Sequence, residues 1–451
     1  MSTAVVDERL VAQPPARKGW IDHWEPEDET FWETTGKAVA RRNLLLSIVV
    51  EHLGFSVWVL WSIVAVNLNA AGFAFTESQL FWLVAVPNLV GATLRLPYTF
   101  AVPRFGGRNW TVVSALLLLV PASALAWAVS NPGTSFGTML GCAALAGLGG
   151  GNFASSMTNI SWFYPERQKG WALGLNAAGG NIGVAVVQAP FVVAAVVTAG
   201  AGLHLGRAGL MWVPLVLLAA AAAWRWMDNL SVATADVASS AAAAKRPHTW
   251  VMAVLYIGTF GSFIGYAAAF PLLIKGQFPD VDVTAYAFLG ALVGSLSRPF
   301  GGRLADRVGG ARVTAISFVA MGLGVLGVVA ALHAGSFGAF FACFMVLFLA
   351  TGVGNGSTYR MIPALFRHGV DPGDPEAVTT AKREAAAAIG IISAVGAYGG
   401  FLVPRTYGWS SAAYGSIVPA LYVYVGVYAV MLAVTWVFYL RRSAPMAAAG
   451  V

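Results

Sequence analysis

The chain has 451 residues, of which 58% are hydrophobic and only 10% are charged. Its mean hydropathy of +0.70 lies far outside the range of an ordinary soluble domain. Most of the 27 Lys and Arg residues fall in the tails and in alternate loops. This distribution explains the net charge of +7 as a feature of membrane topology, so we expect no nucleic-acid partner.

Apolar runs of about 20 residues recur along the chain, and each can cross a hydrocarbon core about 30 Å thick as a helix. Because open strands would leave backbone groups unpaired in lipid, the predicted fold class is an all-α membrane protein. The twelve predicted transmembrane helices span residues 43–66, 80–104, 109–130, 138–162, 170–198, 208–228, 249–274, 283–305, 312–333, 337–362, 383–408 and 416–440.

The distribution of basic residues predicts the topology. Only Arg207, Lys275 and Arg405 lie in the loops of one side, so the positive-inside rule places both termini in the cytosol. We expect a monomeric, multi-pass protein of the cytoplasmic (inner) membrane. Its predicted parts are a cytosolic N-terminal segment at 1–42, a six-helix half at 43–228, a cytosolic linker at 229–248, a second six-helix half at 249–440 and a cytosolic tail at 441–451.

The N-terminal segment holds four aromatic rings among acidic groups. Such rings prefer the membrane–water interface. We therefore expect them to lie along the cytosolic surface of the membrane: Trp20, Trp24, Phe31 and Trp32.

The two halves repeat each other in one register. Arg95 follows Leu89-Val90-Gly91 with the spacing at which Arg298 follows Leu292-Val293-Gly294, and the two arginines are 203 residues apart. This parallel repeat, together with the run Gly-Gly-Arg-Leu-Ala-Asp-Arg-Val-Gly-Gly-Ala-Arg at 301–312, resembles the plan of the major facilitator superfamily. The resemblance implies two pseudo-symmetric halves with the substrate near the midplane between them.

Arg95 and Arg298 are predicted to face each other across the central cavity at equal depth. An arginine inside a membrane costs at least about 2.5 kcal/mol, so each needs a partner or a water-filled cavity. Glu51 is the only acidic residue clearly within a span. The cavity is therefore expected to be electropositive and to bind a small anion, because the guanidinium fork suits planar oxyanions. The alternative is that each arginine snorkels to the cytosolic surface.

Three of the asparagines in the glycine-rich region 147–183 are candidate site residues. Glycines spaced four apart let helix backbones approach closely, and packing alone explains them. Asn152, Asn176 and Asn181 need hydrogen-bond partners, and a neutral amide can donate to an anion without adding charge. Helix-to-helix hydrogen bonds are the alternative for Asn152 and Asn176, whereas we favour a ligand role for Asn181.

The stretches 147–165 and 174–183 resemble the paired glycine-rich signatures of the nitrate/nitrite porter family, and the similarity covers residues 30–440. It continues through Phe260-Gly-Ser-Phe-Ile-Gly265, Gln277-Phe-Pro279 and Gly354-Asn-Gly-Ser-Thr358. The resemblance implies that nitrate, or nitrate and nitrite, binds between Arg95 and Arg298 and is moved by alternating access. The further site residues that it implies, with Asn176 added as a candidate, are Tyr256, Asn181, Phe55, Phe153 and Phe260.

Glu51 and His52 in the first span can both titrate, and an intramembrane carboxylate is by default a functional candidate. Our hypothesis is that Glu51, with His52, takes up the proton in nitrate symport. The alternatives are an interfacial pair near Arg41-Arg42, a nitrate/nitrite antiporter and a passive anion channel. Arg360 belongs either to the cavity or to the cytosolic rim.

We do not expect an enzyme. The sequence has no metal-ligand cluster, no nucleophile with an adjacent base and no nucleotide loop, and we expect no cofactor.

Overall fold

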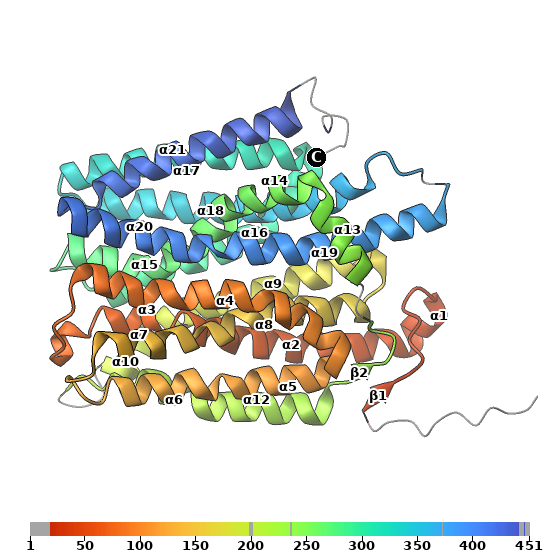
Figure 1. The fold of residues 1–451 in the computed structure, drawn as a ribbon, viewed down its shortest axis with the longest axis horizontal. Helices are drawn as coiled ribbons and strands as arrows, with labels where there is room; N and C mark the ends of the chain where they lie inside the picture. The colour runs from red at the N-terminus through yellow and green to blue at the C-terminus, as the bar shows by residue number, and fades with distance from the viewer. Residues whose placement is uncertain (1–18, 198–201, 235–236, 372, 442–445, 447–451) are drawn as a thin grey trace, which may run out of the picture.

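The computed structural model describes residues 19–197, 202–234, 237–371, 373–441 and 446. The first 18 residues of the predicted N-terminal segment, and most of the predicted tail at 441–451, lie outside the described residues. What is described is almost entirely helical, and the long helices lie side by side along one axis (Figure 1).

The first half consists of helices that are often interrupted by a single residue within one span. Its elements are β1 Trp20–Ile21, α1 Glu29–Phe31, a π-helix Trp32–Gly36, α2 Lys37–Trp58, α3 Trp61–Ala65, a 3₁₀ turn Asn69–Ala71, α4 Glu77–Phe105, α5 Gly107–Leu117, α6 Leu119–Ala128, α7 Phe136–Leu145, α8 Gly147–Phe163, α9 Glu166–Gln188, α10 Pro190–Val197, α11 Gly206–Leu210 and α12 Trp212–Trp226.

The second half follows a short connection that contains β2 Asn229–Leu230 and α13 Val237–Lys245. Its elements are α14 Pro247–Tyr256, a π-helix Ile257–Gly261, α15 Ser262–Gln277, α16 Val283–Val308, α17 Gly310–His333, α18 Phe337–Arg367, α19 Pro375–Ala397, α20 Gly399–Tyr414, α21 Val418–Thr435 and a π-helix Trp436–Leu440.

Ten helical stretches among the described residues are long and apolar enough to cross a membrane. The other two predicted spans, 138–162 and 283–305, are also helical, as α7 with α8 and as α16. These two are richer in glycine and in polar or charged residues, because they carry the glycine-rich stretch and Arg298. The predicted fold of twelve spans in two halves is confirmed, and the protein is an integral, multi-pass membrane protein.

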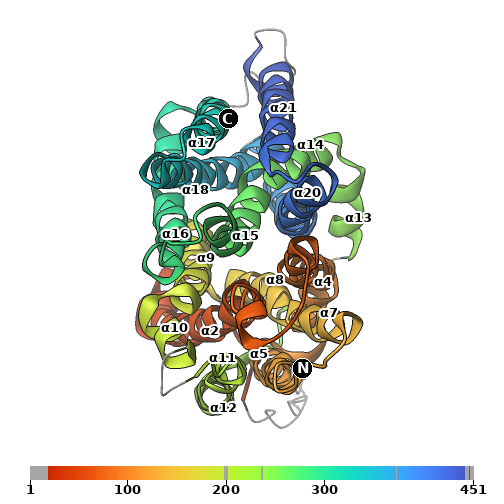
Figure 2. The same cartoon turned by 90° about the vertical axis from the view of Figure 1, so that its left-hand side faces the viewer.

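The two halves form separate groups of helices that meet along a broad boundary (Figure 2). Helix α4 packs against α19 and α20, and α9 packs against α16. Gln188 at the end of α9 joins the halves directly, because its Nε2 donates to Ser62 Oγ at 2.9 Å and to the Ala267 carbonyl at 2.7 Å. The boundary is therefore tied by hydrogen bonds as well as by apolar packing.

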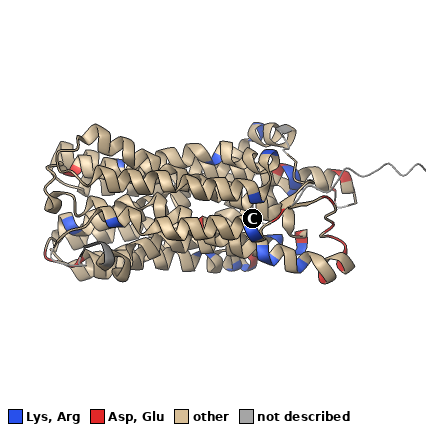
Figure 3. Cartoon of the chain, turned by 90° about the horizontal axis from the view of Figure 1, so that it is seen from below, with Lys and Arg blue, Asp and Glu red and all other residues tan. Residues whose placement is uncertain are grey.

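Lys and Arg residues gather toward one end of the bundle, the end where β1 and α1 lie (Figure 1 and Figure 3). The opposite end carries few of them. This asymmetry is the pattern that the positive-inside rule describes for membrane proteins.

The described N-terminal residues form a clasp, here defined as residues 19–36 together with Asn229–Leu230. Strands β1 and β2 pair in parallel, with Trp20 opposite Asn229. Trp24 Nε1 donates to the Trp162 carbonyl at 3.1 Å, and the Trp32 ring lies 5.6 Å from the ring of Tyr164.

The clasp corrects one expectation about the aromatic rings. Trp24 and Trp32 do not lie along a lipid surface, because protein covers both of them, and none of Trp32 is exposed. Their neighbour Tyr164 belongs to the same cluster, and burial raises the pKa of its hydroxyl to about 12. Apolar residues of α2, α8 and β2 complete a small second core beneath the clasp.

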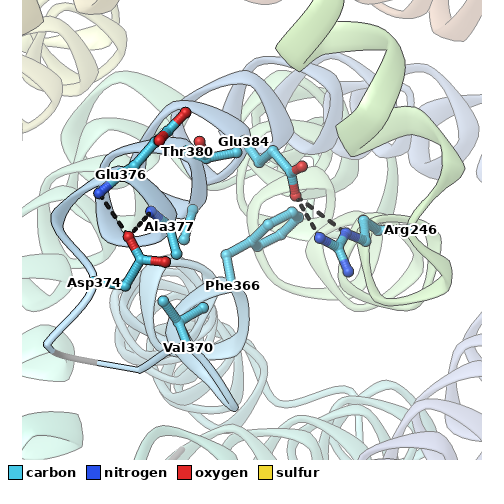
Figure 4. A pocket seen from close by; sticks show the side chains of 9 residues that line it. Arg246, Phe366, Val370, Asp374, Glu376, Ala377, Thr380 and Glu384 are labelled. Atoms are coloured by element: carbon cyan, nitrogen blue, oxygen red, sulfur yellow. Dashed lines mark hydrogen bonds and ion pairs between the residues drawn. The ribbon is translucent and has the colours of Figure 1, made fainter.

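The linker is tied to the second half. Helix α13 packs against α19, and Arg246 Nε and Nη2 donate to Glu384 Oε2 at 3.1 and 2.9 Å (Figure 4). This ion pair lies in the lining of a pocket that also contains Phe366, Asp374 and Glu376.

The clasp generates a prediction about stability. Trp32→Ala removes a fully buried indole and should destabilise the purified protein by about 3 kcal/mol or more. Thermal unfolding in detergent measures the effect. Trp127→Ala is the matched control, since 65% of Trp127 is exposed, and an equal loss in both variants would contradict a buried clasp.

Candidate functional site

Arg95 lies in the middle of α4 with none of its side chain exposed. Its Cζ lies 4.5 Å from the centre of the Phe153 ring and 4.9 Å from that of Phe260. Nη1 donates to the Ser393 carbonyl at 2.9 Å, whereas Nε and Nη2 are buried without a hydrogen-bond partner. The guanidinium is thus held by aromatic faces and one backbone carbonyl.

Arg298 takes the equivalent place on α16 and is only 6% exposed. Its Cζ lies 6.0 Å from the centre of the Phe153 ring and 5.4 Å from that of Tyr359. Nη2 donates to Tyr256 Oη over a long 3.5 Å, and Nη1 has no partner. Both guanidinium groups, one from each half, therefore lie beside the same phenylalanine ring.

No ion pair neutralises either arginine among the residues that the structure describes. The snorkelling alternative requires each arginine to reach the surface, and neither side chain does so. Cation–π contacts of this kind contribute about 0.5–2 kcal/mol each, which offsets part of the cost of burying the charges. The site keeps its positive charge and several unused donors.

A π-helix over Ile257–Gly261 interrupts the seventh span beside the site. Such local widening of a helix occurs frequently at functional sites. It follows Tyr256 directly and contains Phe260, and the two rings stack with centres 5.4 Å apart. The Phe260 ring in turn stacks on Phe153 at 6.3 Å, across the boundary between the halves. Phe55 meets Phe153 edge-on at 6.1 Å. The three predicted phenylalanines thus lie together.

The three asparagines differ in their surroundings. Both amide atoms of Asn181 and both of Asn152 are buried without a hydrogen-bond partner. Asn176 instead donates from Nδ2 to Glu51 Oε2 at 2.7 Å and to Ser156 Oγ at 2.6 Å. The helix-to-helix alternative therefore describes Asn176, which is turned toward the carboxylate.

Glu51 is fully buried in α2. Its Oε1 has no hydrogen-bond partner and lies close to the α9 backbone, since a Cβ on Gly180 would be 2.3 Å away from it. The neighbouring His52 faces the carbonyl of Gly179, with Nδ1 at 3.2 Å. Because none of Glu51 is exposed, it does not lie at a surface, as an interfacial pair of Glu51 and His52 would.

Arg360 belongs to the rim. It is exposed and forms an ion pair from Nε to Asp306 Oδ1 at the end of α16. The residue before it, Tyr359, was missed by sequence reasoning, although it directly follows the motif at 354–358. Its hydroxyl is buried without a partner, and its ring covers the Arg298 guanidinium.

Groups of three or more His, Cys, Asp or Glu side chains that could hold a metal ion are absent from the described part of the chain. The unpartnered N–H groups of Arg95 and Arg298 instead lie beside one phenylalanine ring, Phe153, with the Tyr256 hydroxyl next to Arg298. Such a set of donors is suited to an anion.

The fold and this site define a membrane carrier built from two halves around a buried cationic centre. The model of the Major Facilitator Superfamily matches residues 44–374. Among solved structures, the chain is similar to a D-xylose-proton symporter, with a TM-score of 0.66, 14% identity, and coverage of 91% of this chain and 99% of the other. This likeness concerns the fold alone.

Curated relatives are much closer in sequence. The chain is 45% identical to the nitrate/nitrite transporter NarU of Salmonella typhimurium, over 94% of this chain and 96% of the relative. It is 37% identical to the probable nitrate/nitrite antiporter NarK2 of Thermus thermophilus, over 95% and 98% of the two chains. The chain therefore belongs to the nitrate/nitrite porter family of the Major Facilitator Superfamily.

The glycines of 147–183 support the site by packing. A Cβ on Gly149 would lie 2.2 Å from the carbonyl oxygen of Gly54, and one on Gly183 would lie 2.3 Å from that of His52. Helix α2 thus touches α8 and α9 backbone to backbone, which fixes the depth of Glu51 and Phe55.

Gly149→Ala should therefore lower stability by about 1–3 kcal/mol, because the backbone contact cannot yield without separating the helices. Gly174→Ala, in the second signature, is the control, since nothing lies within 4 Å of its Cβ position. Thermal unfolding in detergent measures the melting temperature of both variants. Equal melting temperatures for Gly149→Ala and the unmodified chain would sink the packing explanation.

Proposed function

We propose that the protein is a nitrate transporter. The observation that carries the proposal is the pair of guanidinium groups, one from each half, that lie beside Phe153 with unused N–H donors and without an ion pair to any described residue. Nitrate is planar and singly charged, so it matches the fork of arginine and the flat faces around it. The relatives named as nitrate/nitrite transporters support the same substrate.

Neutral groups complete the proposed site. Asn181 offers an amide that no protein group uses, and the Tyr256 hydroxyl has only a long contact to Arg298. Both can donate to an oxyanion without changing the net charge. Phe55, Phe153 and Phe260 exclude water from the site, which strengthens each of these interactions.

Alternating access follows from the position of the site. We propose that the half at 43–228 and the half at 249–440 rock about the site, with both termini in the cytosol and the monomer resident in the cytoplasmic membrane. Since each half contributes one arginine, an anion that binds both draws the halves together. An empty site leaves two like charges to repel each other across the same boundary.

Proton-coupled symport is our preferred mode of transport. Importing a monoanion against an inside-negative potential costs about 2.3 kcal/mol per 100 mV, so more than one proton per nitrate makes uptake favourable. Glu51 is the proposed proton acceptor, because it is a fully buried carboxylate with a free oxygen one helical turn from Phe55. Its neighbour His52, turned toward Gly179, is the second candidate.

Nitrate/nitrite exchange is the second candidate for the mechanism. It avoids the electrical cost altogether, and one relative of 37% identity is named a probable nitrate/nitrite antiporter. Exchange needs no titrating group, so it leaves Glu51 without a role.

The arginine pair is tested by Arg95→Lys and Arg298→Lys. Lysine keeps the charge but loses the planar fork, so we expect the kcat/KM for nitrate uptake to fall about tenfold or more in each variant. Arg360→Lys is the control, because Arg360 is exposed and its ion pair with Asp306 tolerates lysine. Uptake at the unmodified rate in both site variants would rule out bidentate binding.

Proteoliposomes separate the transport modes. For symport, external nitrate alkalinises the medium when the lumen holds no nitrite, and Glu51→Gln abolishes this alkalinisation while nitrate/nitrate exchange persists. Strict dependence of uptake on internal nitrite would instead establish antiport. Labelled nitrate counterflow is the test against a passive channel, since a carrier shows counterflow and an open pore does not.

A further inference from the structure

The first turn of α4 lies at the end of the bundle opposite the clasp. Helix α4 ends at Phe105 beside the clasp, because the backbone N–H of Asn109, which follows shortly after, donates to Asn229 Oδ1 at 3.2 Å. The helix has 29 residues and is therefore about 43 Å long, and it runs along the long axis of the bundle (Figure 1). Its first residue, Glu77, thus lies at the opposite end. We call this the outer end, because in the proposed topology it faces away from the cytosol.

The two halves meet at the outer end through α4 and α20. The Glu77 carboxylate accepts a hydrogen bond from the Ser411 hydroxyl, and the Trp82 ring lies 5.8 Å from the ring of Phe401. Ser411 and Phe401 both belong to α20, which is part of the second half. An anion that approaches Arg95 along α4 from this end must therefore wait until these contacts part.

Arg405 of α20 lies inside this contact. Its Cζ lies 3.9 Å from the centre of the Trp82 ring. Nη1 is buried without a hydrogen-bond partner, and a Cβ on Gly408 would lie 2.8 Å from Nη1 and 2.8 Å from Phe81 Cβ. Arg405 forms no ion pair with the residues that the structure describes. Residues of the first half therefore cover a guanidinium group of the second half that keeps its charge.

Arg405 has surroundings like those of the two site arginines, but it lies elsewhere. Trp82 precedes Arg95 by 13 residues, so Arg405 lies about 20 Å from the central site along α4. The cation–π contact explains why the guanidinium rests on the Trp82 ring, yet it leaves Nη1 unused. A buried donor without a partner is costly, which indicates that Nη1 acquires one when α4 moves away. An oxyanion is a suitable partner, because it accepts from the guanidinium and compensates its charge.

We propose that Arg405 is an outer anion-binding residue that captures nitrate before it reaches the central site. When the halves part at the outer end, Phe81 and Trp82 move away with α4 and uncover the guanidinium. Glu77 is also on α4, so the same movement carries its carboxylate away from Arg405. Closure brings α4 back over Nη1, so the anion must leave Arg405 for the central site before the outer end can close. The inference rests on the proposed nitrate transport and adds a binding step to it.

Arg405→Gln tests the capture step in proteoliposomes. We expect the kcat/KM for nitrate uptake to fall about tenfold, because the variant lacks the charge that attracts and holds the incoming anion. Raising the ionic strength should then slow uptake less steeply than in the unmodified protein. Stabilisation of the detergent-purified variant by added nitrate, which measures equilibrium binding at the central site, should stay unchanged. Arg405→Lys keeps the charge and should recover most of the lost uptake.

Trp82→Leu separates capture from closure of the outer end. It removes the ring but leaves the guanidinium of Arg405, so capture predicts a kcat/KM at or above the unmodified value. If Arg405 only held the outer end closed by its contact with the ring, Trp82→Leu and Arg405→Gln would lower kcat/KM equally.

Lys275→Gln is the matched control, because it removes the same charge at the same end. A Cβ on Gly276 would lie 3.5 Å from Glu77 Oε1, which places Lys275 at the outer end. Lys275 is exposed, and its Nζ donates to the Pro279 carbonyl at 2.9 Å. This variant should keep the unmodified kcat/KM. Thermal unfolding in detergent checks that all the variants are folded.

The outcomes separate the two proposals. Equal kcat/KM values in Arg405→Gln and Lys275→Gln, with nitrate uptake intact in the unmodified protein, overturn only the capture inference. Equal losses in Trp82→Leu and Arg405→Gln overturn it as well, since the guanidinium then acts only by closing the outer end. Absence of nitrate uptake by the unmodified protein overturns the proposed function instead.

Discussion

The rest of this structure depends on two like charges that lie in a low-dielectric interior and form no ion pair with the part of the chain that the structure describes. The two Cζ atoms lie 4.5 and 6.0 Å from the centre of the Phe153 ring and so no more than about 10.5 Å apart, where two unit charges repel by about 1.6 kcal/mol at an effective dielectric constant of about 20. Cation–π contacts contribute about 0.5–2 kcal/mol each, so the aromatic rings around Arg95 and Arg298 offset only part of the combined repulsion and burial. A bound anion supplies the negative charge that compensates the two arginines.

The scaffold keeps this costly centre in place by rigid local means. Glycines bring α2 into backbone contact with α8 and α9, so the helices cannot separate to admit lipid or water. The π-helix after Tyr256 brings the Tyr256 and Phe260 rings into a stack that continues to Phe153 in the opposite half. The electrostatic strain is therefore confined to the boundary between the halves, which is where a carrier must move.

The spans could be predicted because each is an apolar run long enough to cross a bilayer. The arginine pair could be predicted because one motif is repeated at a constant offset in the two halves. The sequence also placed Glu51 correctly as an isolated carboxylate inside a span. The partner of Asn176 could not be predicted, since a buried amide satisfies either a neighbouring helix or a ligand. Tyr359 was missed because a tyrosine at the end of a glycine-rich helix is ordinary until the fold brings it over Arg298.

The parallel pairing of β1 with β2 has a consequence for biosynthesis. The apolar cluster beneath the clasp draws on residues no later in the chain than Ala233, so every contact it needs exists once the sixth span has left the ribosome. Trp20 and Ile21, though made first, must wait for Asn229 and Leu230 before they can pair. The first half can thus complete the clasp as an independent folding unit while the second half is still being translated.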